Sequence, residues 1–158
     1  MVTLYYIRRF LNFWADRFEH TSIQEIAISE EVKHLFGRIF SIFAENKNLL
    51  NTGFRNSDRR RITDELGKAG SLYREQIYRN AFSGKKEMIE TRELLAFIKL
   101  ALNYTDQSID ANKRADGLYH AYNLISFSDK DLSIRYLYEM LEGQVAVLSS
   151  GYLPVKEC

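Results

Sequence analysis

The densest group of side chains able to do chemistry lies in one segment, residues 114–123, with the sequence RADGLYHAYN. Within this segment the helical spacing of apolar residues breaks down. Polar and aromatic side chains on a loop that a rigid scaffold holds are typical of binding sites, and aromatic rings beside carboxylate, amide and guanidinium groups suit a sugar ring. The candidate ligand-binding residues are Arg114, Asp116, Tyr119, His120, Tyr122 and Asn123.

The same segment can also be interpreted as a structural corner, in which the tyrosines and His120 bond to neighbouring helix ends. We favour the corner and keep carbohydrate binding as the alternative. Acid–base chemistry on a glycoside needs two carboxylates in different environments. Asp116, Glu139 and Glu142 have the right side chains, but no spacing in the sequence brings them together. Catalytic residues therefore stay unassigned, and we do not expect this chain alone to be an enzyme.

Each of the three histidines follows a carboxylate at helical spacing; the pairs are Asp16 and His20, Glu31 and His34, and Asp116 and His120. The Glu31-x-x-His34 spacing occurs in carboxylate-bridged metal sites of helical bundles, which need a second such pair and two further glutamates. The sequence has no second Glu-x-x-His. Two ligands four residues apart also fall short of a zinc site. We therefore expect no metal and no other cofactor.

Basic residues gather in three places, at Arg59–Arg61, Lys85–Lys86 and Lys113–Arg114. A shared phosphate-binding surface would require the fold to bring them together. Acidic residues are interspersed with all three clusters, and 22 Lys and Arg balance 21 Asp and Glu to a formal charge of +1. With no overall positive field, nucleic acid is not expected as a partner.

The chain lacks the run of roughly 20 apolar residues that spans a bilayer, and its first residues lack the apolar core of a signal peptide. The single cysteine, Cys158, excludes a disulfide framework and fits a reducing compartment. We therefore expect a cytoplasmic protein that does not contact a membrane. An apolar share of 46%, with ten Phe and ten Tyr, is ample for a folded core.

Apolar residues recur at helical spacing through most of the chain, and its only proline is Pro154. Residues 1–158 are predicted to form a single all-α domain, either an antiparallel bundle or an array of helical hairpins. No internal repeat of fixed period is visible. Ser29 and Thr91 are predicted caps, and Ser128 with Asp131 resembles a capping box before the last helix. The five predicted helices are Leu4–Phe18, Glu30–Phe43, Asp58–Arg79, Arg92–Ile109 and Leu132–Leu148.

The first predicted helix carries an unusually aromatic stripe, formed by Ile7, Phe10, Leu11, Trp14 and Phe18. An apolar stripe normally faces the core. A large exposed one marks a surface that binds another protein or another copy. The sequence leaves both interpretations open.

Three stretches of the C-terminal half carry a family resemblance: REQIY at residues 74–78, RADGLYHAYN at 114–123 and YEMLEGQVAVLSSG at 138–151. From about Ser71 onward the chain resembles a helical stretch of large multidomain bacterial proteins of unknown function. Those proteins are in turn distantly similar to carbohydrate-active enzymes with helical toroid domains, such as the cellobiose phosphorylases. The resemblance implies that the chain is a piece of a longer protein, and it transfers no catalytic residue.

The leading hypothesis is a helical scaffold or interaction module, either complete or part of a larger bacterial protein. Its expected partner is another protein or the remainder of a longer chain, with a homo-oligomer also open. The alternative is a carbohydrate-binding or carbohydrate-processing segment that uses the residues of 114–123. Neither the substrate nor the partner can be read from the sequence.

Overall fold

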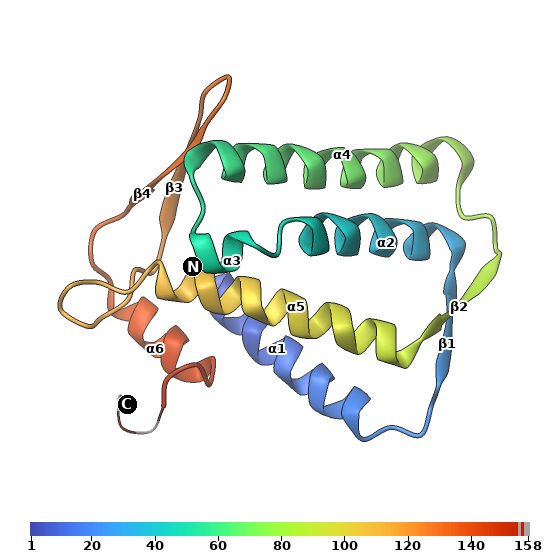
Figure 1. Cartoon of the computed structure of the whole chain (residues 1–158), viewed down its shortest axis with the longest axis horizontal. Helices are drawn as coiled ribbons and strands as arrows, with labels where there is room; N and C mark the ends of the chain where they lie inside the picture. The colour runs from blue at the N-terminus through green and yellow to red at the C-terminus, as the bar shows by residue number, and fades with distance from the viewer. Residues whose placement is uncertain (155, 157–158) are drawn as a thin grey trace.

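The computed structural model describes residues 1–154 and 156. This part of the chain is mainly helical and also contains two small antiparallel sheets of two strands each (Figure 1). The elements are α1 (Val2–Glu19), β1 (Glu25–Ser29), α2 (Glu30–Glu45), α3 (Leu49–Thr52), α4 (Asn56–Asn80), β2 (Lys86–Glu90), α5 (Thr91–Asp110), β3 (Asn123–Phe127), β4 (Leu132–Tyr136) and α6 (Leu141–Ser149). None of these helices is long and apolar enough to cross a membrane.

The prediction of an all-α fold was wrong, because four segments pair as strands. β1 pairs with β2 from Glu25↔Glu90 to Ser29↔Lys86. The second sheet is a hairpin in which β3 pairs with β4. Ser128 and Asp131, predicted as a helix cap, instead close this hairpin: the backbone N–H of Ser128 bonds the carbonyl of Asp131 at 2.9 Å, and the Ser128 hydroxyl accepts the Asp131 N–H at 3.0 Å.

The last predicted helix was also too long at its start. Residues 132–136 form β4, and α6 begins only at Leu141. The other four long helices occupy the predicted segments with ends shifted by a few residues, and the connection between α2 and α4 contains the single turn α3. Gly151, with φ +66°, ends the last helix in the left-handed conformation that glycine tolerates best.

The four long helices form an open row in the order α4, α2, α5, α1 (Figure 1). In this row α2 and α5 are interior, whereas α4 and α1 form the two edges. The last helix, α6, packs against the N-terminal half of α1, and the β3–β4 hairpin lies beside the start of α4. Each edge helix therefore covers one neighbour and leaves its outer side uncovered by the rest of the row.

The row contains two similar units, α1–β1–α2 and α4–β2–α5, joined by the pairing of β1 with β2. Reciprocal hydrogen bonds mark the similarity. The Glu30 N–H bonds the Lys85 carbonyl at 3.2 Å, and the Thr91 N–H bonds the Gln24 carbonyl at 2.8 Å. These donors are the first residues of α2 and α5, so the sheet sets where both interior helices begin.

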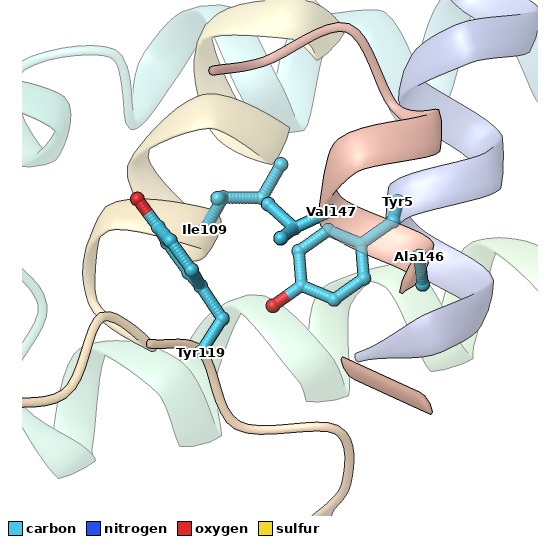
Figure 2. Close-up of a cluster of buried hydrophobic side chains, with 5 residues drawn as sticks. All are labelled: Tyr5, Ile109, Tyr119, Ala146 and Val147. Carbon is cyan, nitrogen blue, oxygen red and sulfur yellow. The ribbon is translucent and has the colours of Figure 1, made fainter. Parts of the chain in front are cut away.

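Two groups of side chains fill the interior. An aromatic group between α2 and α5 includes Phe36 and Phe97, whose ring centres lie 5.1 Å apart in an edge contact. The second group joins α1, α5, the 111–122 loop and α6 (Figure 2). Its members are Tyr5, Ile109, Tyr119, Ala146 and Val147. The Tyr5 hydroxyl donates to the carbonyl of His120 at 3.2 Å, which ties α1 to the loop.

The closest backbone approach against this second group is at Gly143 of α6. A Cβ added there would lie 2.9 Å from the Tyr119 carbonyl oxygen and 3.0 Å from the Ala121 nitrogen. Both are backbone atoms that cannot rotate away. We expect Gly143→Ala to lower the free energy of unfolding by about 1–3 kcal/mol, as overpacking does.

The matched control is Gly67→Ala in the middle of α4, where an added Cβ meets nothing within 4 Å. Alanine has the higher helix propensity, so this variant should gain roughly 0.5–1 kcal/mol. Urea denaturation followed by circular dichroism measures both changes. A Gly143→Ala protein as stable as the wild type would show that α6 does not pack this closely on the loop.

Candidate functional site

The 114–123 segment forms the tight corner that links α5 to the β3–β4 hairpin. The Arg114 N–H bonds the Leu118 carbonyl at 2.7 Å, and Gly117 supplies the left-handed φ of +83° that closes the turn. The His120 N–H then bonds the carbonyl of Asn112 at 3.1 Å, at the end of α5. Backbone hydrogen bonds therefore hold the shape of this corner.

Arg114 is the centre of a charged cluster at this corner. Its guanidinium binds the carboxylate of Asp116 at 2.5 Å and also the carboxylate of Glu139, which precedes α6. The Arg114 side chain is only 12% exposed, against 72% for Glu139. The structure therefore brings together two of the three carboxylates that the sequence could not place. Asp116 and Glu139 both bind the guanidinium of Arg114, so their environments are similar. A general acid and a general base need carboxylates in different environments.

His120 stacks on Tyr136 of β4, with ring centres 3.9 Å apart and planes 2° from parallel. Its Nδ1 is buried and has no hydrogen-bond partner among the described residues. Burial lowers the pKa of His120 from its ordinary 6.5, the positive charge of Arg114 lowers it further, and Glu139 and Asp116 oppose the change. The imidazole is therefore held in its neutral form, as in a packed corner.

The other candidate residues of the segment differ in how far solvent reaches them. Tyr119 is buried, and Gln144 of α6 bonds both its N–H at 3.0 Å and its carbonyl at 2.7 Å. Tyr122 is exposed and donates its hydroxyl to Glu142 at 2.8 Å, a hydrogen bond that raises the pKa of Tyr122. Asn123 opens β3 with its side-chain oxygen buried. Carbohydrate binding at this corner stays a prediction.

The remaining histidine pairs take different forms. Glu31 is buried and accepts the Ser83 N–H at 2.7 Å, and hydrogen bonds from Ser83 lower the pKa of Glu31. His34 lies on the exposed side of α2. His20 and Asp16 lie together on the exposed end of α1, with 3.3 Å between Nδ1 and Oδ1. His34 in turn lies beside Glu30, one helical turn earlier on α2, and beside Glu87 of β2.

Two arginines of the basic cluster on α4 pair with carboxylates of the same helix. Arg60 pairs with Asp64 at 2.8 Å, and Arg61 pairs with Glu65 at 3.4 Å. Arg60 also bonds the carbonyl of Ser128 in the hairpin turn. These arginines therefore form ion pairs along α4, and Arg60 also holds the hairpin turn against this helix.

A continuous aromatic surface covers the outer side of α1. We define the outer α1 face as Tyr6, Ile7, Phe10, Phe13 and Trp14, all of which are exposed. The predicted stripe thus faces solvent at Ile7, Phe10 and Trp14, while the buried residues of α1 are Tyr5 and Ala15. The rings of Phe10 and Phe13 make edge contacts with Trp14 at 6.2 Å and 5.6 Å.

The neighbouring helix α6 also has exposed apolar side chains. Gly143, Ala146 and Val147 are buried. On the opposite side Leu141, Val145 and Leu148 are exposed, and they follow one another at helical spacing. A helix that is apolar on both sides is normally covered on both. Two adjacent helices therefore each present an apolar surface to solvent.

No protein-family model matches the chain, and a search of the curated proteins finds no match.

The charged cluster predicts how the His120 pKa responds to its neighbours. Replacing Arg114 by Gln removes a nearby positive charge, so the pKa of His120 should rise; Glu139→Gln should lower it further. Titration of the His120 ring protons by NMR measures both.

Because the folded-state pKa of His120 is lowered, the unfolded chain binds the extra proton first, and wild-type stability should fall as the pH drops below about 6.5. An Arg114→Gln protein with an unchanged His120 pKa would contradict this electrostatic account.

Proposed function

We propose that the chain is a helical interaction module that binds another protein through the outer α1 face. The observation that carries the proposal is a contiguous set of five large apolar side chains, exposed between 38% and 60%, on one side of one helix. Scattered apolar residues are ordinary on a monomer, but a contiguous aromatic patch marks a binding surface. Trp, Tyr, Phe and Arg are also the residues that interfaces favour.

The position of the outer α1 face suggests how it is covered. Since α1 is an edge of the open row, a helix laid along it would continue the row by the same side-by-side packing that joins α1 to α5. Arrays of stacked helices need a polar outer side on their end helices to stay soluble. The other edge, α4, meets that requirement with its arginine–carboxylate pairs, whereas α1 does not.

We further propose that the partner helix is α1 of a second copy, laid antiparallel around a two-fold axis. Such a contact must be self-complementary. An axis near the middle of α1 would place Phe10 against Trp14 of the second copy, and exposed Arg9 close to Asp16 of the second copy. The sequence spacing of α1 therefore provides both the apolar centre and the charge complementarity of an isologous interface.

The test is the oligomeric state of the purified chain, measured by sedimentation velocity over a wide range of concentrations. We expect a concentration-dependent dimer. Phe10→Asp, at the centre of the face, should weaken dimerisation by about 2 kcal/mol or more, the loss typical of a central aromatic residue. Circular dichroism checks that the fold is kept.

The matched control is Tyr78→Asp on α4, because Tyr78 is an exposed aromatic residue at the opposite edge of the row. This variant should dimerise like the wild type. A chain that stays monomeric at every concentration, or a Phe10→Asp protein that dimerises equally well, would refute self-association through α1.

A further inference from the structure

We infer that the start of α2 and strand β2 form a binding site for a divalent transition-metal ion such as zinc. One potential ligand atom from each of Glu30, His34 and Glu87 lies within 4.8 Å of the other two. Glu30 and His34 are one helical turn apart on α2, and Glu87 comes from β2. The three groups thus converge from two elements that the β1–β2 pairing holds together.

The donor set fits this class of ion. Imidazole favours zinc and its neighbours over magnesium and calcium, and carboxylates complete many zinc sites. Ligands about 2.0–2.1 Å from zinc lie roughly 3.4 Å apart in a tetrahedron. Small side-chain rotations would therefore close the cluster around an ion. Three protein ligands leave one position for water.

A second, independent observation comes from Glu31. This side chain is 1% exposed, and its Oε2 has no hydrogen-bond partner among the described residues. Glu31 lines a hollow of about 270 Å³ between α2 and α4 that His34 also lines. Ser83 connects it to the cluster, because the Ser83 N–H bonds Glu31 at 2.7 Å while the Ser83 hydroxyl bonds Glu30 at 3.3 Å. A metal-bound water would supply the donor that Oε2 lacks, in the way that outer carboxylates orient metal sites.

The surrounding charges are compatible with an ion. Lys33 bonds one oxygen of Glu87 at 3.0 Å, and a carboxylate has a second oxygen to offer a metal. The pairing of Glu87 with Lys33 also keeps its carboxylate beside α2 when no ion is bound. An ion bound to all three residues would connect the first turn of α2 to β2 and so stabilise the sheet end of α2.

The similar unit of the chain provides an internal comparison. Its α5 begins at Thr91 as α2 begins at Glu30, and the places equivalent to Glu30 and His34 hold Thr91 and Leu95. Neither side chain of this equivalent pair is a zinc ligand of the kind that protein sites use. The cluster is therefore specific to the α2 end of the sheet, rather than a by-product of the fold.

The test uses the full chain carrying Cys158→Ser, so that its one thiol does not compete for the metal. Zinc binding is measured by calorimetry, and cobalt binding by its visible absorption, which reports coordination directly. We expect one ion per chain and a higher melting temperature with zinc. His34→Ala and Glu87→Gln should each weaken binding by at least tenfold, and Glu31→Gln should weaken it less.

The matched control is His20→Ala, because His20 also has a carboxylate one helical turn away, Asp16, but belongs to no such three-ligand cluster. This variant should bind zinc as the parent does. Zinc affinity that is unchanged in folded His34→Ala, or lost equally in His20→Ala, would overturn the site. Absence of any binding by the parent chain would overturn it as well.

Discussion

The arrangement of the long helices depends on the antiparallel pairing of β1 with β2. β1 runs directly into α2, and β2 runs directly into α5, with no loop between strand and helix. Pairing the strands therefore sets the starting points and the common direction of α2 and α5. Phe36 and Phe97 lie equally far along these helices and meet across the interface. Tyr104 then bonds the carbonyl of Phe43 at 2.7 Å further along. Once the two interior helices lie side by side, α1 packs on the free side of α5 and α4 packs on the free side of α2, which gives an open row.

The helices were predictable because their signal is local. Apolar residues at helical spacing located the four long helices to within a few residues, with no knowledge of their neighbours. The strands were missed for two different reasons. β1 and β2 are short, and each needs a partner more than fifty residues away before it becomes a strand. In β4, Leu132, Ile134 and Tyr136 alternate with polar residues, a visible strand pattern. That pattern merged with the apolar residues of α6 and was interpreted as one long helix.

The candidate sites were predictable in composition but not in orientation. The sequence shows that α1 is aromatic, yet a helix that is apolar around most of its circumference does not specify its buried side. Contacts from distant residues make that choice: Arg8 of α1 bonds Asp106 of α5 at 2.6 Å and the Ser150 carbonyl at 3.0 Å. The same holds at α2, where the sequence paired Glu31 with His34. In the structure His34 lies beside Glu30, one helical turn away, and beside Glu87, which the sheet brings from β2.

The two edges of the row occupy similar places in the two units but have opposite chemistry. On α4, ion pairs such as Arg60 with Asp64 and Arg79 with Glu75 lie along the helix itself. Each contributes only about 0.3–0.5 kcal/mol, so their main effect is to keep that edge hydrated. On α1, two charged side chains instead reach α5: Arg8 bonds Asp106, and Glu19 bonds Lys99 at 2.6 Å. The charges of α1 that make these contacts secure it to α5, and the aromatic rings are left outside. A row built in this way has an apolar edge at α1 and a charged edge at α4.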